Sequence, residues 1–156
     1  MAGTKGACNL IIPVSETEIP IAAEIHSASW IDAHRDFCDR AFLEQHSPEN
    51  QQRFLQNERK LGKEFFMLVA RKPVGIVSLK ENLIENLYIL PREQGKGYGT
   101  ALLLFAISRC VGEPTLWILD NNEKAFLFYT KHGFEKTGKV NYITDSLSEL
   151  EMKKRL

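Results

Sequence analysis

Three closely spaced glycines give this sequence its clearest candidate for a ligand-binding site. Gly95, Gly97 and Gly99 lie between two apolar runs, residues 83–90 and 101–107. Glycine accepts positive φ angles and lets a ligand approach the main chain closely. The unpaired N–H groups at the start of a helix, together with the helix dipole, bind anions such as phosphate. The pattern therefore predicts a strand, a phosphate-binding turn and a helix, in that order.

Two familiar phosphate sites fit this spacing poorly. A P-loop requires a Gly-Lys pair followed by Ser or Thr, whereas Lys96 is flanked by glycines. A dinucleotide-binding turn requires G-x-G-x-x-G with an acidic residue about 20 positions later. Asp120 lies at such a distance, but the glycines read G-x-G-x-G and too little chain follows them for the rest of a nucleotide domain and a substrate domain. A nucleotide-dependent oxidoreductase stays an alternative, which would require NAD binding.

The same turn resembles the signature of an enzyme superfamily. The order Gln94-x-x-Gly97-x-Gly99 resembles the Q/R-x-x-G-x-G/A motif of the GNAT superfamily of N-acetyltransferases. Residues 86–91 resemble the fourth strand of that fold, and residues 122–134, reading N-x-x-A-x-x-F-Y-x-x-x-G-F, resemble its later helix and the strand beyond. The three motifs occur in the family's order and cover roughly residues 64–137. The resemblance implies transfer of an acetyl group from acetyl-CoA to an amine.

The resemblance also implies which residues contact acetyl-CoA. Its pantetheine arm is expected to pair, like an added strand, with the main chain of a strand that splays from its neighbour near a bulge. Its pyrophosphate is expected on the N–H groups of the glycine turn. The cofactor-binding residues implied in this way are Leu87, Tyr88, Ile89, Gln94, Gly95, Lys96, Gly97, Tyr98, Gly99, Thr100, Asn122 and Phe128.

Two residues are candidates for proton transfer by the same resemblance. Tyr129 would protonate the departing thiolate as a general acid. Glu85 is the candidate base, because a lysine-like amine has a pKa near about 10.4 and must lose a proton before it attacks. The N–H of Leu87 would stabilise the oxyanion that forms on the thioester. No cysteine falls within the matched motifs, so we expect direct attack in a ternary complex.

Apolar periodicity and turn residues predict one α/β (α+β) domain over residues 1–156. Its expected architecture is a mixed, mostly antiparallel central sheet flanked by helices. Strands are predicted at residues 8–14, 64–71, 75–80, 83–90, 115–120, 134–142 and 147–156. Helices are predicted at residues 19–34, 48–61, 101–107 and 122–131.

Three local features are predicted within these elements. Along residues 83–90, strict alternation puts Glu85, Leu87 and Ile89 on one face of the sheet and the even-numbered residues on the other. Residues 101–107 are apolar nearly all round, so the helix there is expected to be buried. Ser15 and Glu18 have the spacing of a capping box.

Composition narrows the classes of function. The chain has 156 residues, of which 44% are hydrophobic and 26% charged, and 20 basic residues balance 20 acidic ones. No global field favours nucleic acid or a membrane, no apolar run approaches the roughly 18 residues of a membrane helix, and no signal peptide is recognisable. Cys8, Cys38 and Cys110 share no C-x-x-C spacing, which favours a reducing, cytoplasmic location. The histidines show no metal-ligand spacing, so no metal is expected.

The acceptor stays open at this stage. A small-molecule amine and a peptide or protein amine are both compatible with zero net charge. In the family, the helix–loop–helix region that includes residues 30–46 covers the acceptor side, and Trp30 and Phe37 are expected to anchor its packing. Dimers are common in the family, so a homodimer is among the expectations. A non-catalytic acyl-CoA-binding or sensing module on the same fold is the remaining alternative.

Overall fold

The computed structural model describes residues 9–36 and 38–156; Cys8 and Phe37 lie outside the described residues. Its strands are β1 (Leu10–Pro13), β2 (Glu64–Val69), β3 (Pro73–Lys80), β4 (Leu83–Ile89), β5 (Thr115–Leu119), β6 (Phe134–Thr144) and β7 (Leu147–Lys154). Its α-helices are α1 (Ile19–His34), α2 (Arg40–Glu44), α3 (Pro48–Lys60), α4 (Tyr98–Arg109) and α5 (Glu123–Lys131). A 3₁₀ turn, η1 (Pro91–Glu93), links β4 to the glycine turn.

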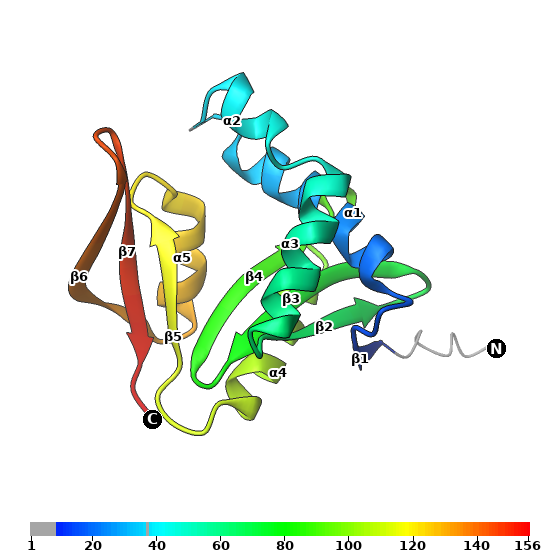
Figure 1. The fold of residues 1–156 in the computed structure, drawn as a ribbon. Coiled ribbons are helices and arrows are strands. Elements are labelled where there is room, and N and C mark those ends of the chain that lie inside the picture. The colour runs from blue at the N-terminus through cyan, green and yellow to red at the C-terminus, as the bar shows by residue number, and fades with distance from the viewer. Residues whose placement is uncertain (1–8, 37) are drawn as a thin grey trace, which may run out of the picture.

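The described strands form one seven-stranded sheet in the order β1-β2-β3-β4-β5-β7-β6. Each pair of neighbours is antiparallel except β4 and β5, which run parallel and share a single register pair, Leu83 with Thr115. Beyond that pair the two strands diverge, as Figure 1 shows. The mixed, mostly antiparallel sheet confirms the predicted fold class.

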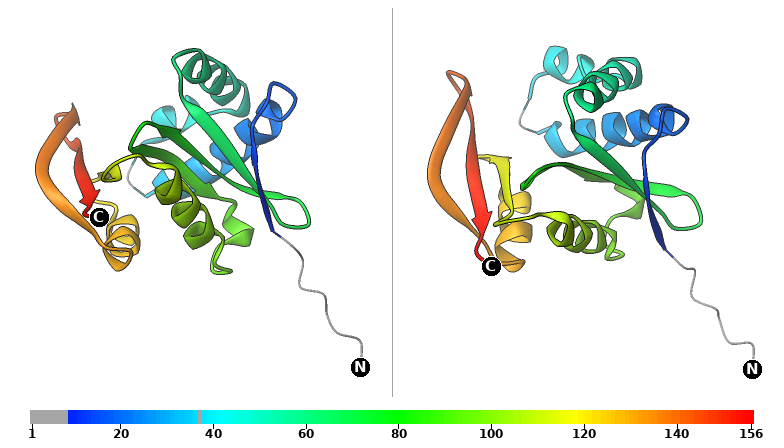
Figure 2. Two further views of the ribbon diagram at one scale, coloured as in Figure 1. Left: turned by 90° about the horizontal axis from the view of Figure 1, so that it is seen from below. Right: turned by 60° about the horizontal axis from the view of Figure 1, so that its bottom comes forward.

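The helices cover the two faces of the sheet unequally (Figure 2). On one face, α4 and α5 cover a core in which Leu102 and Leu103 of α4 join Leu116 of β5 and Met152 of β7. On the other face, α1 and α3 cover a second core that extends from β1 to Tyr88 on β4. The first core therefore continues beneath the divergence of β4 and β5, whereas the second core ends at β4.

Short polar residues and glycines bound two of the helices, close to the predicted ends. The side chains of Ser47 and Asn122 each accept a hydrogen bond from the N–H group three residues later, at 3.2 and 3.1 Å. Gly62 and Gly133 follow α3 and α5 with φ angles of +94° and +89°, a conformation that glycine adopts without strain. Each of these helices therefore begins and ends close to where its sequence signals lie.

Three local predictions differ from the structure. Before α1, the Ser15 hydroxyl donates to the Glu18 carboxylate instead of accepting from the Glu18 N–H, so only half of the capping box forms. α2 was not predicted, because five residues are too few for a helical period. β3 begins at Pro73, two residues before the predicted start, since a proline is tolerated as the first residue of a strand.

The predicted alternation holds from Leu87 to Leu90 but is wrong for Glu85, because an extra residue interrupts β4. Ile76 of β3 pairs with Tyr88, and Ser78 pairs with Glu85, so Asn86 and Leu87 together oppose one residue of β3. Asn86 has a φ angle of +52°, which asparagine tolerates better than most residues, and its amide donates to the Ser78 hydroxyl at 2.8 Å. The bulge places Glu85 on the same face as Tyr88, where it pairs with Lys63, and leaves Leu87 against the opposite core.

The prediction that α4 is buried on all sides is also wrong. Leu102 and Leu103 are fully buried, whereas Leu104 is 56% exposed. α4 lies on the outside of the sheet, so only one side of the helix can reach the core. An apolar residue on the outer side is no exception, because much of any protein surface is apolar.

We expect Leu102→Ala to lower the free energy of unfolding by about 2–5 kcal/mol, because it leaves a cavity in a closed core. Leu104→Ala, on the same helix, is the matched control and should change it by less than about 0.5 kcal/mol. Urea unfolding of both variants measures the difference. Equal losses would mean that both sides of α4 are packed.

Candidate active site

The edge of β4 that faces β5 has no strand partner over most of its length. The N–H of Leu90 donates to the carbonyl of Val74 on β3 at 2.9 Å. Main-chain groups alternate in direction along a regular strand, so Tyr88 also faces β3, while Ile89 faces β5. Leu87, a residue of the bulge, has no register partner on β3. Because β4 and β5 share only the register pair at Leu83, the main chain of Leu87 and Ile89 is left open.

The glycine turn continues from this open edge. Gly95 and Gly97 have φ angles of +77° and +85°, and Gly97 is the N-cap of α4. The first bond of the helix runs from the Ala101 N–H to the Gly97 carbonyl at 3.1 Å. Within the described chain, no acceptor meets the N–H groups of residues 95–100. Unpaired donors at the start of a helix, together with the helix dipole, are a favourable environment for an anion.

Gln94 connects the two sides of the divergence. Its Nε2 donates to the Ile89 carbonyl at 3.2 Å, and its Oε1 accepts from Lys124 of α5 at 3.1 Å. Lys96, the cation within the turn, pairs with Glu93 at 2.8 Å. Lys124, which the sequence did not single out, is a positive side chain beside the turn that contacts an amide oxygen and, among the described residues, no carboxylate.

Helix α5 supplies a wall opposite the turn. Asn122 uses its Oδ1 to cap the helix, so its amide N–H groups stay available as donors. The Phe128 ring lies 3.6 Å from where a Cβ on Gly99 would be. A Cβ there would be in ordinary van der Waals contact with the ring, so the Phe128 side chain of α5 packs beside the first turn of α4.

Three ionisable side chains meet at the divergence: Tyr129, Tyr88 and Glu85. Tyr129 packs with the core beneath α5, and Tyr88 packs with the core on the opposite face. Burial raises the pKa of the Tyr88 hydroxyl, and the nearby Tyr129 and Glu85 raise it further. Burial also raises the pKa of Tyr129.

Lys63 brings a buried positive charge to this group. Its side chain is 8% exposed, and its Nζ lies 2.5 Å from a carboxylate oxygen of Glu58 and 2.5 Å from one of Glu85. Burial acts to lower the pKa of Lys63, but the hydrogen bonds that it donates to the two carboxylates, together with their negative charges, outweigh burial, and the net shift is upward. The lysine therefore stays charged.

Aromatic stacking orders the predicted acceptor side. The Trp30 ring lies between the imidazoles of His34 and His46, with centroid distances of 4.0 and 3.4 Å. The Ser27 hydroxyl donates to the His46 carbonyl at 2.5 Å, which ties α1 to the segment after α2. Trp30 thus anchors this region as predicted, through stacking at a half-buried position.

His26 is a second buried histidine on α1, beside His34. Its ring stacks on Tyr88 at a centroid distance of 5.1 Å, and its Nδ1 has no hydrogen-bond partner among the described residues. Burial lowers the pKa of His26 to about 3, with smaller contributions from His46, His34 and Lys63. His26 is therefore neutral at physiological pH and presents an uncharged surface to Tyr88.

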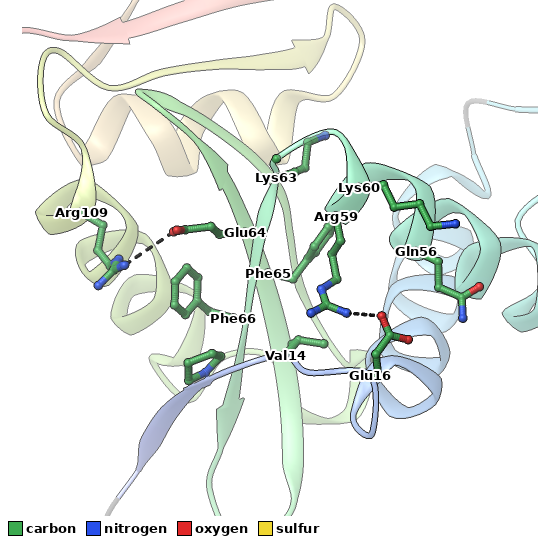
Figure 3. A pocket seen from close by; sticks show the side chains of 12 residues that line it. Val14, Glu16, Gln56, Arg59, Lys60, Lys63, Glu64, Phe65, Phe66 and Arg109 are labelled. Carbon is green, nitrogen blue, oxygen red and sulfur yellow. Dashed lines mark hydrogen bonds and ion pairs between the residues drawn. The ribbon is translucent and has the colours of Figure 1, made fainter.

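A separate hollow of about 570 Å³ lies away from the glycine turn (Figure 3). Arg59 at its rim pairs with Glu16 at 2.6 Å, and Arg109 pairs with Glu64 at 3.5 Å. None of residues 94–100 lines this hollow, so it is not part of the candidate site.

Neither a metal site nor a membrane-spanning helix is found in the described part of the chain. No group of three or more metal-ligating side chains occurs within residues 9–36 and 38–156. Over the same residues, no helix is long and apolar enough to cross a bilayer.

Comparison with known proteins supports a family assignment. The model of the GNAT acetyltransferase domain matches residues 17–156, which is most of the chain. The chain belongs to the GNAT acetyltransferase family. The resemblance predicted from the three motifs is thereby confirmed, and so is the assignment to the acyltransferases.

Solved structures agree with the fold of this GNAT chain. The PaiA N-acetyltransferase from Thermoplasma acidophilum, solved with coenzyme A, is 23% identical, with 96% of this chain and 99% of that chain covered and a TM-score of 0.71. A ribosomal-protein-alanine N-acetyltransferase from Brucella melitensis is 20% identical, with 94% and 99% covered and a TM-score of 0.70. A putative streptothricin acetyltransferase from Bacillus anthracis str. Ames, solved with acetyl coenzyme A, is 19% identical over 60% and 62%, with a TM-score of 0.55.

In this GNAT chain the structure brings most of the predicted site residues together. Residues 94–100, Asn122, Phe128 and Tyr129 surround the divergence of β4 and β5. Tyr88 is placed differently from Leu87 and Ile89, since its main chain faces β3 and its side chain belongs to the other core.

Besides Lys124, two residues of the site, Lys63 and His26, were missed by sequence reasoning. Lys63 carried no signal beyond its position after Gly62. His26 directly follows the apolar Ile25 in a predicted helix, which offered a hint of burial. No pattern predicted that its ring stacks on Tyr88.

The low pKa of His26 predicts a specific loss of stability in acid. In the unfolded chain its pKa is near 6.5, so between that pH and about 3 only the unfolded state binds the proton. Stability from this residue is present above about pH 6.5 and falls by about 1.4 kcal/mol per pH unit below it. Between about pH 7.5 and pH 5, His26→Phe should therefore lose about 2 kcal/mol less than the wild type.

Urea unfolding at both pH values measures this effect. Leu102→Ala is the control, because it weakens the fold but retains His26, and it should lose as much on acidification as the wild type. An unchanged acid loss in His26→Phe would show that His26 is charged in the native state.

Proposed function

We propose that this chain transfers an acetyl group from acetyl-CoA to a primary amine by direct attack in a ternary complex. The observation that carries the proposal is the continuity between the open edge of β4 and the unpaired N–H groups of residues 95–100. Pantetheine amides can pair with Leu87 and Ile89 as an added strand would. Pyrophosphate can accept hydrogen bonds from the turn. Solved relatives that contain coenzyme A or acetyl coenzyme A support the same ligand.

Gln94 takes part in this binding through its side-chain amide. Its Nε2 occupies the Ile89 carbonyl, which is one of the main-chain groups that the pantetheine arm would use. Binding therefore exchanges one hydrogen bond for another of similar strength at this carbonyl. Lys124, released from Gln94, would lie near the phosphates as a counter-charge.

The residues around the divergence can serve each step of the transfer. The bound thioester supplies an electrophilic carbon. The Leu87 N–H would donate to its carbonyl oxygen as negative charge develops. Glu85 would accept the proton of the amine, directly or through water, and Tyr129 would donate its proton to the departing sulfur. Because burial raises the pKa of Tyr129, the phenol keeps its proton until the thiolate forms.

The acceptor is proposed as a class only, a primary amine of a small molecule, peptide or protein. Glu85 and the stacked wall at Trp30 flank the route to the thioester. Free Cys38 and Cys110 agree with a cytoplasmic location. A non-catalytic acyl-CoA sensor would bind acetyl-CoA equally well and would release no thiol with any amine.

We expect Gly97→Val to weaken acetyl-CoA binding at least about tenfold, because a branched side chain would enter the phosphate site at a left-handed position. A thermal-shift titration with acetyl-CoA, CoA, NAD and ATP measures this. Acetyl-CoA at about 100 times its Kd should stabilise the wild type by about 2.7 kcal/mol.

Gly138→Val is the matched control for this variant. Gly138 has a φ angle of +94° and, like Gly97, has no atom within 4 Å of where a Cβ would lie, but it belongs to β6, away from the site. Gly138→Val should lower the free energy of unfolding about as much as Gly97→Val does and leave the Kd for acetyl-CoA unchanged. A shift with NAD alone, or normal affinity in folded Gly97→Val, would contradict the placement of the pyrophosphate.

Tyr129→Phe should lower kcat at least about tenfold and leave the Kd for acetyl-CoA nearly unchanged, because only the proton donor is lost. Thiol release at saturating substrates gives kcat. Tyr142→Phe, at a side chain that is 79% exposed, is the control and should behave as the wild type. An unaltered kcat in Tyr129→Phe would remove the general-acid role.

A further inference from the structure

Lys63 forms ion pairs with Glu58 and with Glu85, the proposed general base. Lys63 lies between the end of α3 and the start of β2, and Figure 3 shows it at one rim of the separate hollow. Its Nζ contacts Oε2 of Glu58 and Oε2 of Glu85, both at 2.5 Å. The structure gives Oε1 of Glu85 no partner among the described residues. Oε2 of Glu85 is thus held by Lys63, and Oε1 is free to accept a proton.

We propose that Lys63 is a positioning residue for Glu85, holding one carboxylate oxygen so that the other accepts the proton of the incoming amine. This inference rests on the proposed transfer to an amine. The Glu85 side chain is 35% exposed, so it can contact an acceptor. The Lys63 side chain is 8% exposed, so it acts on the acceptor only through Glu85.

Glu58 sets how strongly Lys63 holds Glu85. Two carboxylates share one ammonium, so the three groups together carry one net negative charge. A carboxylate that faced its own lysine alone would be a weaker base, because a full positive charge beside it opposes protonation. The shared lysine therefore orients Glu85 and leaves negative charge to balance the positive charge that develops on the attacking amine.

The surrounding groups connect this pair to the site of transfer. Glu85 and Tyr88 pair with Ser78 and Ile76 of β3, two residues apart, so both side chains lie on the same face of β4 next to each other. In agreement with this, Glu85 contributes to the raised pKa of Tyr88, after burial and Tyr129. Lys63 contributes to the lowered pKa of His26 on α1, after burial and two other histidines. From the elements packed around the pair, the ionisable neighbours are therefore Glu58, His26, Tyr88 and, across the opening, Tyr129.

Two substitutions should move the pH profile in opposite directions. Lys63→Met removes the positive charge, so the acid limb of kcat/KM should lie at higher pH, and kcat/KM near neutral pH should fall at least about tenfold. Glu58→Gln leaves Lys63 to Glu85 alone, so the acid limb should lie at lower pH. A loss of packing alone cannot produce opposite shifts. Lys63→Arg keeps the charge and should bring the limb back toward that of the wild type.

The measurements are kcat/KM for the amine against pH at saturating acetyl-CoA, and a ¹³C NMR titration of the Glu85 carboxyl carbon. Lys60→Met is the matched control, since Lys60 is a lysine at the end of the same helix that makes no ion pair with Glu85, and it should match the wild type in both. The Kd for acetyl-CoA should stay unchanged in every variant.

The two readouts separate failure of the inference from failure of the proposed function. The inference is overturned if the Glu85 titration midpoint and the acid limb of kcat/KM do not move, or move the same way in Lys63→Met and Glu58→Gln. Turnover by the wild type would still uphold the proposed transfer. A wild type that binds acetyl-CoA but releases no thiol with any amine would overturn the transfer, and with it the catalytic meaning of the pair, even if the carboxyl midpoint moves.

Discussion

One extra residue in β4 is the constraint on which the candidate site depends. Asn86 occupies a left-handed position and is held by the buried Ser78 hydroxyl, so the strand gains a residue without losing its pairing to β3. The extra residue turns Glu85 toward the face that carries Tyr88. It also fixes which main-chain groups beyond it point away from β3. A bulge of this kind re-aims side chains beside functional sites in many proteins, and here it aims a carboxylate and two main-chain groups at one opening.

The two cores of the molecule have different tasks around that opening. The core beneath α4 and α5 continues from β3 to β7, so it holds the two diverging strands at a fixed distance. The core beneath α1 and α3 ends at Tyr88, which leaves room on that face for an acceptor. Tyr129 belongs to the first core and lies close enough to Tyr88, in the second, to affect it. Acid and base candidates thus come from opposite faces of the sheet and meet where it is open.

Sequence reasoning was most accurate where a residue's role is local. The turn before α4, the starts of α3 and α5, and the positions of the strands along the chain follow from short-range preferences, and the structure has them close to where they were predicted. It failed at Glu85, because strict alternation cannot foresee a bulge, although an asparagine within an apolar strand was an available hint. It missed Lys63 because its partners lie 5 and 22 positions away and are joined to it only by the packing of α3 against the sheet. The buried, neutral state of His26 likewise depends on helices that meet in three dimensions.

The single register pair between β4 and β5 has a consequence for the way the molecule comes apart. Backbone hydrogen bonds cross from the first half of the sheet to the second at one place, near Leu83 and Thr115. Elsewhere the halves are joined by side-chain packing and by the bridge of Gln94 to Lys124. Regions linked in this way open as cooperative units with their own free energies. The segment from β5 to β7 is therefore built as a unit that can detach in amide exchange before the first half unfolds, and a ligand that pairs with both halves would merge the two units into one.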